Sequence, residues 1–208
     1  MVLHNFIVFE GLDGSGTTTQ LSLLKNILSD KKTWFTAEPT DQEIGKFLRK
    51  ILQGSITVQP ETLAYLFAAD RCEHIHGING IECRINDGYT VFCDRYLFSS
   101  LAYQSPQCGS KLPMTLNEDF PLPEYLIYFD INSELSLSRV ASRNGETEIF
   151  EKSDIQKITQ IEYERIIQTY KENKPEEMKI ISIDAAKPVE EVHKIILDSL
   201  KNLPIIKE

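Results

Sequence analysis

The stretch FEGLDGSGTTTQ, residues 9–20, decides the fold because it places three glycines between an apolar run and an amphipathic one. The overlapping residues 5–10, NFIVFE, form a nearly continuous apolar run, which is typical of a strand buried on both faces. After the glycines, Leu21, Leu24 and Leu28 follow at helical spacing. Strand, glycine-rich turn and helix in this order predict a loop whose backbone N–H groups surround phosphate.

The glycine spacing fits a phosphate-binding loop at every position except one. Gly11 and Gly16 are correctly spaced and Thr18 supplies a hydroxyl for Mg²⁺, but Thr17 stands where a lysine is expected. A glycine-rich turn without a ligand is the alternative, and the flanking strand and helix argue against it. We therefore predict nucleotide contacts from the loop residues Gly11, Leu12, Asp13, Gly14, Ser15, Gly16, Thr17 and Thr18.

Further apolar runs alternate between strand and helix periodicity. Strands are expected at 33–39, 89–96, 122–131 and 178–185, helices at 17–30, 41–52, 60–87 and about 188–200, and a loop at 105–113. This alternation predicts an α/β fold with a five-stranded parallel sheet between two helical layers. The 208 residues suit one domain, so we expect residues 1–208 to form a single unit.

Composition narrows the class of protein. The net charge of −9 disfavours general binding to nucleic acid, which is itself a polyanion. The sequence has no signal-peptide pattern and no apolar run of membrane-spanning length, so we expect a cytoplasmic protein without a membrane segment. Free thiols in a reducing compartment are expected for the four cysteines, which lack metal-site spacing: Cys72, Cys83, Cys93 and Cys108.

Polar residues follow several of the predicted strands. Ligands of open parallel sheets bind beyond the carboxyl ends of the strands. Besides the glycine loop, Glu38-Pro39, Asp94-Arg95 and Asp130 are expected at that edge. Their convergence from separate parts of the sequence predicts a binding site there.

Several short motifs, taken in order, resemble the thymidylate kinase family, whose members phosphorylate dTMP with ATP. The motifs are FEGLDGSG, TTQ, EP, LFAADR, DRY with SS and AYQ, and IDA. The resemblance covers residues 5–103, 123–143 and 181–192, and it is weak at 105–120 and in the polar segment 143–154. It implies a P-loop nucleoside monophosphate kinase fold, ATP and Mg²⁺, a homodimer, and a lid at about 143–154, although a plain solvated connection also fits that segment.

The resemblance also assigns roles to residues. It implies that Asp13 lies between donor and acceptor, that Phe67 stacks on the base and that Arg71 hydrogen-bonds the base. The implied substrate-binding residues are Glu38, Pro39, Arg49, Phe67, Arg71, Arg95, Ser99, Ser100, Tyr103 and Gln104. The implied metal-binding residues are Thr18 and Asp94, and the implied catalytic residues are Asp13 and Arg95. Arg143 is a third catalytic candidate, on grounds of charge balance and not of resemblance.

Each of these residues also has a simpler interpretation. Phe67 could belong to the core, and Tyr103 could be a packed aromatic residue. Arg71 could pair with Asp70 or Glu73 on a solvated face, and Asp94-Arg95 could be a surface ion pair of little energetic value. The order of the motifs along the chain favours the functional interpretation.

Three cations typical of the family are missing. Thr17 replaces the loop lysine, Ala37 replaces an arginine before Glu38-Pro39, and the segment EIFE at 148–151 lacks a basic residue. We hypothesise that Arg139 or Arg143, four residues apart on a helix, takes over the role of the lysine at the ATP phosphates, with Lys152 as a poorer candidate.

Three functions remain open from the sequence. The first is dTMP phosphorylation by a kinase with an altered phosphate loop. The second is a kinase for another nucleoside monophosphate or for a deoxynucleoside, although Arg49 and Arg95 would have no phosphate to bind on a deoxynucleoside. The third is a catalytically silent nucleotide-binding protein.

Overall fold

The computed structural model describes residues 1–142, 148–173 and 178–207. In this part of the chain, five parallel strands form one sheet in the order β2-β3-β1-β4-β5. The strands are β1 (Val2–Gly11), β2 (Thr33–Ala37), β3 (Thr90–Asp94), β4 (Leu122–Asp130) and β5 (Lys179–Asp184). The predicted parallel α/β sheet is confirmed.

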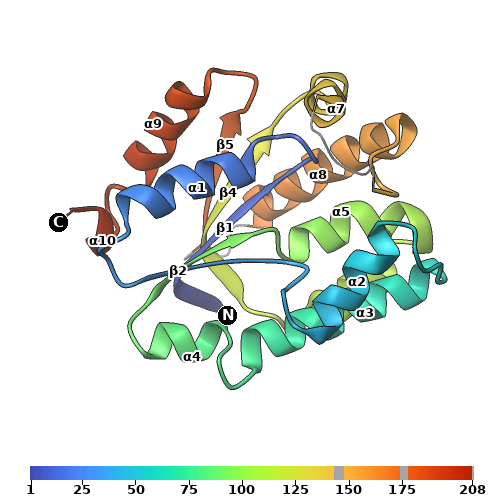
Figure 1. The fold of residues 1–208 in the computed structure, drawn as a ribbon, viewed down its shortest axis with the longest axis horizontal. Coiled ribbons are helices and arrows are strands. Elements are labelled where there is room, and N and C mark those ends of the chain that lie inside the picture. The colour runs from blue at the N-terminus through green and yellow to red at the C-terminus, as the bar shows by residue number, and fades with distance from the viewer. Residues whose placement is uncertain (143–147, 174–177, 208) are drawn as a thin grey trace.

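Helices cover both faces of the sheet (Figure 1). Helix α1 packs beside α9 on one face, and α5 packs against α3 and α8 on the other. The described helices are α1 (Thr17–Ile27), α2 (Glu43–Leu52), α3 (Pro60–His76), α4 (Ile81–Asn86), α5 (Leu97–Cys108), α6 (Lys111–Asn117), α7 (Ser133–Ala141), α8 (Ser153–Asn173), α9 (Val189–Leu200) and α10 (Pro204–Lys207).

The central strands form the core of the sheet. Phe6, Ile7, Val8 and Phe9 of β1 are all fully buried, as expected for a strand with helices on both sides. The register pairs Phe9 with Asp94, so the ends of β1 and β3 lie together. The carboxyl ends of all five strands therefore meet at one edge, where the glycine loop begins.

The continuous helix expected over 60–87 is wrong. Helix α3 ends at His76 and α4 begins at Ile81. Gly77 donates its N–H to the Glu73 carbonyl and ends α3, and a Cβ on Gly80 would lie 2.7 Å from the Ile75 carbonyl oxygen. The two glycines allow a tight turn that apolar periodicity alone does not reveal.

The loop expected at 105–113 is also largely wrong. Helix α5 continues through Pro106 to Cys108, and α6 begins at Lys111. The proline marked the segment as irregular, but Pro106 lies exposed in the last turn of α5, where its missing N–H removes only one helical hydrogen bond.

Candidate active site

The glycine loop connects β1 to α1 through two left-handed glycines. Gly14 has φ 89° and Gly16 has φ 101°, and Ser15 donates its N–H to the Leu12 carbonyl at 3.0 Å. A Cβ on Gly14 would lie 2.5 Å from the backbone oxygen of Ser136 in α7, so this position also needs glycine for close packing. The loop thus has the tight form in which backbone N–H groups can surround a phosphate.

Beside this loop, at the carboxyl edge of the sheet, lies a cavity of about 350 Å³. It brings together most of the residues that the sequence analysis assigned to a site. Those lining it are Asp13, Thr18, Glu38, Pro39, Arg49, Phe67, Arg71, Asp94, Arg95, Ser99, Ser100, Tyr103 and Gln104. The other predicted loop residues, Gly11, Leu12, Gly14, Ser15, Gly16 and Thr17, do not line it, and Thr17 is 8% exposed at the start of α1.

Asp13 connects the glycine loop to the opposite wall of the cavity. Its carboxylate accepts Arg95 Nη2 at 2.5 Å, the Tyr103 hydroxyl at 3.1 Å and Gln156 Nε2 at 2.9 Å. Three elements therefore fix this carboxylate: the turn after β3, α5 and α8. Tyr103 is a packed aromatic residue and also a donor to the site.

Arg95 has a backbone φ of 70°, which is uncommon for a residue with a side chain and often marks a functional site. Its Nη1 donates to the Gly11 carbonyl and to Ser99 Oγ, both at 3.1 Å. The surface-pair alternative is not what the structure shows, because Arg95 pairs with Asp13 and not with its neighbour Asp94.

A buried carboxylate supports the turn that carries Arg95. Glu10 Oε1 accepts the backbone N–H groups of Tyr96 at 2.8 Å and Ser99 at 3.1 Å, and Oε2 accepts the Ser99 and Tyr163 hydroxyls at 2.6 and 2.8 Å. Burial raises the pKa of Glu10 to about 7, against the opposing effects of the Ser99 hydrogen bond and the Arg95 charge.

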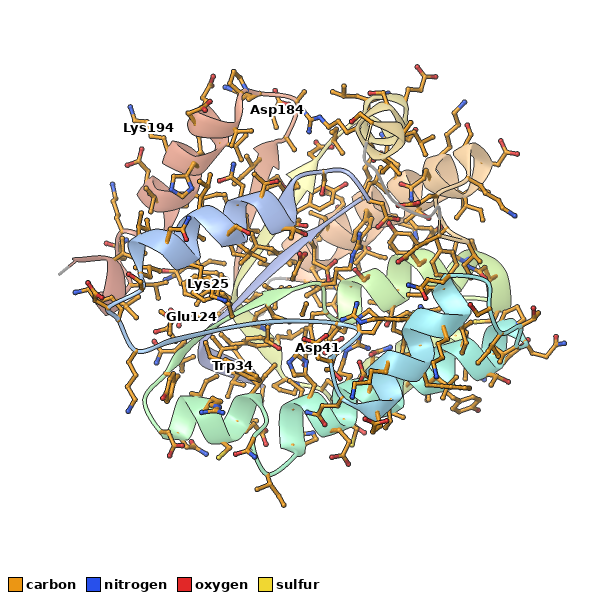
Figure 2. The ribbon with its side chains drawn as sticks, viewed as in Figure 1. Lys25, Trp34, Asp41, Glu124, Asp184 and Lys194 are labelled. Carbon is orange, nitrogen blue, oxygen red and sulfur yellow. The ribbon has the colours of Figure 1, made fainter. Side chains whose placement is uncertain are left out.

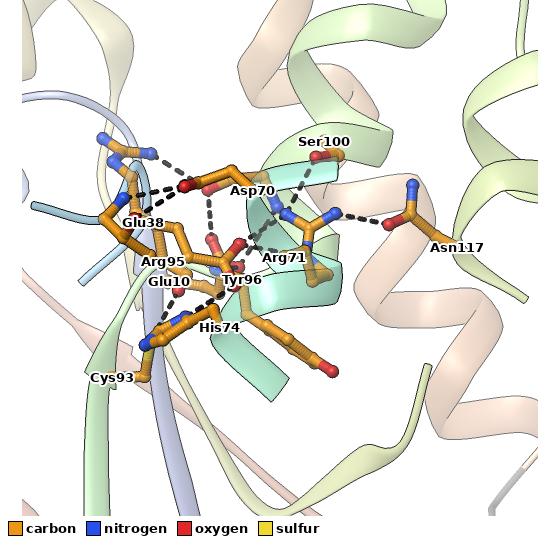
Figure 3. A network of polar contacts seen from close by, with 12 residues as sticks. Glu10, Glu38, Asp70, Arg71, His74, Cys93, Arg95, Tyr96, Ser100 and Asn117 are labelled. Carbon is orange, nitrogen blue, oxygen red and sulfur yellow. Dashed lines mark hydrogen bonds and ion pairs between the residues drawn. The ribbon is translucent and has the colours of Figure 1, made fainter. Parts of the chain in front are cut away.

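Arg71 forms the other end of the cavity and is 1% exposed. Its Nε and Nη2 donate to Glu38 Oε2 at 2.9 and 2.6 Å, Nη2 also donates to Ser100 Oγ at 3.0 Å, and Nη1 donates to Asn117 Oδ1 (Figure 3). A solvated pair with Asp70 or Glu73 is therefore excluded.

Two further residues complete this end of the cavity. Phe67 is half-buried on α3, one turn before Arg71. Gln104 is 3% exposed, and its Oε1 has no hydrogen-bond partner among the described residues. A buried acceptor without a partner costs free energy unless a ligand or water satisfies it.

Arg49 lies at the end of α2 that faces the cavity. Its Nη2 donates to the Pro39 carbonyl and lies 3.2 Å from Asp41 Oδ1. Asp41 lies in the connection between β2 and α2 (Figure 2). Its side chain is almost fully exposed, so Arg49 can exchange this weak partner for a phosphate.

Thr18 and Asp94 have the groups that a Mg²⁺ site needs. The Thr18 hydroxyl donates to Asp94 Oδ2 at 2.7 Å, and Asp94 Oδ1 is buried without a partner in the described parts of the chain. Oxygen ligands of this type suit Mg²⁺, which usually keeps waters and phosphate oxygens as its other ligands. Consistent with this, residues 1–142, 148–173 and 178–207 contain no cluster of three or more His, Cys, Asp or Glu side chains that could hold a metal alone.

Arg139 and Arg143 are the two arginines proposed to replace the lysine. Arg139 is on α7, which packs on the glycine loop, and its Nη1 donates to the Ala185 carbonyl at 2.9 Å. Arg143 and the rest of 143–147 lie outside the described residues, so this part of the expected lid has no structural account here. The following residues Glu148, Phe150 and Glu151 line the cavity.

The cavity is rich in carboxylates. Its described lining contains three arginines and five acidic residues. Burial, together with repulsion from Asp13 and Glu151, raises the pKa of Glu148. Phosphate groups entering the cavity therefore need every cation it offers, and Asp13 and Glu38 already occupy Arg95 and Arg71.

Sequence reasoning missed several supporting residues. Glu10 could have been noticed as a charge that ends a buried strand, and His74 as a polar residue one turn after Arg71. Asn117, Gln156 and Tyr163 come from helices whose sequences carry no motif, so only the tertiary structure places them at the site.

A phosphate-type glycine loop, a parallel sheet and an arginine-lined cavity at its carboxyl edge define a P-loop nucleotide-binding fold of the nucleoside monophosphate kinase type. A sequence profile described as thymidylate kinase matches residues 9–196. The chain belongs to the thymidylate kinase family.

Individual relatives agree with this assignment. A Treponema pallidum protein whose name places it among thymidylate kinases is 42% identical over 207 residues, with 99% of each chain covered. A similarly named Methanococcus aeolicus protein is 41% identical over 206 residues, covering 98% of this chain and all of its own. The solved thymidylate kinase of Candida albicans has the same fold, with a TM-score of 0.79 at 23% identity, covering 97% of this chain and 92% of its own.

Proposed function

We propose that this protein transfers the γ-phosphoryl group of ATP to dTMP, giving dTDP. The observation that carries the proposal is the pair of groups at the base end of the cavity. Gln104 presents an unpartnered acceptor, and Arg71 has five N–H groups of which four are used within the described residues. Thymine offers the complement, an N3–H donor beside a carbonyl acceptor.

The opposite end of the cavity suits the acceptor phosphate. Arg49 and Arg95 can present planar forks to phosphate oxygens, and Arg95 is held at the glycine loop by Asp13. Two arginines there favour a monophosphate acceptor over an uncharged nucleoside. Tyr103, which donates to Asp13, lines the same cavity and is proposed to contact the sugar of the bound nucleotide.

The reaction requires positioning and charge neutralisation more than proton transfer, because the acceptor is already a phosphate oxygen. The backbone N–H groups of the loop bind donor phosphates, and Arg95 bridges the loop and the acceptor. Thr18 and Asp94 would hold Mg²⁺, which neutralises charge on the donor phosphates when bound. Glu10, through Tyr96 and Ser99, keeps Arg95 in its strained position.

We further propose that Arg139 or Arg143 provides the positive charge that Thr17 lacks. The excess of carboxylates in the described cavity lining supports a need for another cation. Arg139 can exchange its bond to the Ala185 carbonyl for a phosphate at modest cost, because both are hydrogen-bond acceptors.

A coupled assay with ATP and Mg²⁺ tests the proposal against a panel of dTMP, dUMP, dCMP, dGMP and thymidine. We expect the highest kcat/KM with dTMP. A preference for another monophosphate or for thymidine would overturn the assignment of the acceptor. Nucleotide binding without turnover would show that the protein is the third alternative, a catalytically silent nucleotide-binding protein, which the absence of the loop lysine favours.

The assembly is also a proposal. We infer a homodimer, as the family resemblance implies, and a location in the cytoplasm, as expected from a sequence without a signal-peptide pattern. Phe47 on α2 and Tyr65 on α3 are 39% and 56% exposed and could pack against a second copy. Sedimentation equilibrium tests the homodimer, and a monomer at micromolar concentration would contradict it.

None of the helices within residues 1–142, 148–173 and 178–207 has the length and hydropathy of a membrane span.

A further inference from the structure

His74 is a buried titratable side chain that the proposed chemistry does not use. It lies on α3 and is 1% exposed. Its Nδ1 is 3.0 Å from Glu38 Oε1 (Figure 3). Its Nε2 is 2.7 Å from the Thr36 hydroxyl on β2. The ring therefore bridges a strand of the sheet and the carboxylate that holds Arg71.

The Glu38 carboxylate assigns the direction of its hydrogen bond with the ring. An ionised Glu38 carboxylate only accepts, so Nδ1 of His74 donates to it. The Thr36 hydroxyl can donate to or accept from Nε2, and in either case it holds the second ring nitrogen in place.

Glu38 divides its two oxygens between two partners. Oε2 accepts from Arg71, whereas Oε1 accepts from His74. With both oxygens held, the carboxylate cannot rotate about its terminal bond, and the guanidinium plane of Arg71 is fixed. Ser100 and Asn117 hold the rest of that guanidinium from the opposite side.

The backbone around Glu38 is anchored without His74. The Glu38 N–H donates to the Asp94 carbonyl at 3.0 Å. Asp70 accepts the Thr40 N–H at 2.7 Å and the Thr40 hydroxyl at 2.6 Å. Loss of the His74 ring should therefore release the Glu38 side chain while leaving residues 38–40 in place.

We propose that His74 is a positioning residue for base recognition. It fixes Glu38, and Glu38 fixes Arg71 so that the remaining N–H group on Nη1 points to the base. The group recognised in this way is a pyrimidine with a carbonyl at position 4, since a guanidinium only donates. A 4-amino pyrimidine would be rejected by the same geometry. This inference rests on the proposed function.

The test compares His74→Ala with the wild type. We expect KM for dTMP to rise about tenfold, as for a lost hydrogen bond to a charged group, with kcat changed less than threefold. KM for ATP should stay unchanged, and the ratio of kcat/KM for dTMP over dCMP should fall about fivefold. A purely structural role would lower the melting temperature without moving KM or this ratio, and that result would overturn the inference.

Two further variants keep the test decisive if His74→Ala does not fold. In His74→Asn the side-chain amide can take the place of Nδ1 and donate to Glu38, so KM should lie within about threefold of the wild type. Thr36→Val removes only the hydroxyl that contacts Nε2 of His74 and should raise KM for dTMP about threefold. The proposal is contradicted if Thr36→Val keeps the wild-type KM and base selectivity and folded His74→Ala shows no change in KM. If His74→Ala does not fold, the result for Thr36→Val decides alone.

The matched control is His193→Ala. His193 on α9 also contacts a polar side chain through Nδ1, Gln20 Oε1 at 3.0 Å, but it does not line the cavity. Its dTMP kinetics should be unchanged. A wild-type protein that neither binds nor phosphorylates dTMP overturns the proposed function and this inference together, whereas normal wild-type activity with indifferent His74 variants overturns only this inference.

Discussion

The base end of the cavity and the glycine loop, at which the donor phosphates are proposed to bind, differ in how their cations are held. At the base end, Arg71 is buried and bonded to Glu38, Ser100 and Asn117. At the donor end, formed by the glycine loop and the neighbouring α7, an uncharged Thr17 begins α1 and Arg139 is bonded to a backbone carbonyl, and neither residue lines the cavity. Recognition of the acceptor is therefore preorganised within the protein, while neutralisation of the donor phosphates depends on groups that must still engage.

Arg95→Ala should have the largest effect, because Arg95 lines the cavity while its guanidinium is bonded to Asp13 and Gly11 of the glycine loop. We expect kcat to fall about 10²–10³-fold, the range for loss of one preorganised electrostatic donor. Steady-state kinetics at saturating ATP and dTMP measure this change. Arg165→Ala on α8, whose side chain pairs with Glu162 by hydrogen bonds, is the control and should retain activity. A loss below tenfold for Arg95→Ala would show that the two ends act independently.

Arg71→Ala should weaken the base end most strongly. It leaves Glu38 buried at 5% exposure without its countercharge, which typically costs about 3–5 kcal/mol of stability. We expect KM for dTMP to rise about a hundredfold, and thermal unfolding to shift downward. The double variant Arg71→Ala with Glu38→Gln should recover most of the melting temperature but not the KM. Recovery of both would mean that Arg71 is structural only.

Thr17→Lys tests the donor end by restoring a cation. If the donor phosphates lack charge, kcat should rise about tenfold, with little change in KM for dTMP. Thr19→Lys, an exposed position on the same helix, is the control for added charge and should leave kcat unchanged.

Alanine variants test whether Arg139 or Arg143 compensates for the uncharged Thr17. Arg143→Ala and Arg139→Ala should lower kcat in the wild-type background, and Thr17→Lys should offset the loss for whichever arginine replaces the lysine. Full kcat in both arginine variants would remove the compensation hypothesis.

Glu10→Gln should have the smallest effect on rate and a distinct effect on stability. The folded protein holds a proton on Glu10 up to about pH 7, whereas the unfolded chain releases it near the reference value of 4.5. Folding therefore binds a proton between these values, and this contribution to stability is present below pH 4.5 and is lost as pH rises to about 7.

The expected loss across this window is about 3 kcal/mol. Chemical denaturation at pH 5 and pH 7.5 measures it. Glu10→Gln should flatten this part of the pH profile, and the exposed Glu190→Gln should leave it unchanged. An identical slope in the wild type and Glu10→Gln would show that Glu10 is ionised throughout the window.

Sequence reasoning located much of the site because its residues lie in short motifs at strand ends. Phe67 and Arg71 share one helix face, and Asp94-Arg95 follow a buried strand, so local spacing sufficed. It erred where local signals competed with packing. The turn at 77–80 depends on close backbone approach at Gly80, and Pro106 is tolerated in the last turn of α5, where it is exposed and removes only one helical hydrogen bond.

The sequence by itself determined the strand–loop–helix order, the parallel sheet and many of the side chains at its carboxyl edge, because periodicity and glycine spacing act over a few neighbouring residues. Only the tertiary structure decided which charges pair. Arg71 forms its ion pair with Glu38 and not with Asp70 or Glu73. Arg95 forms its ion pair with Asp13 and not with Asp94. Burial removes water as a competing partner, so ion pairs follow proximity in space across elements far apart in the chain.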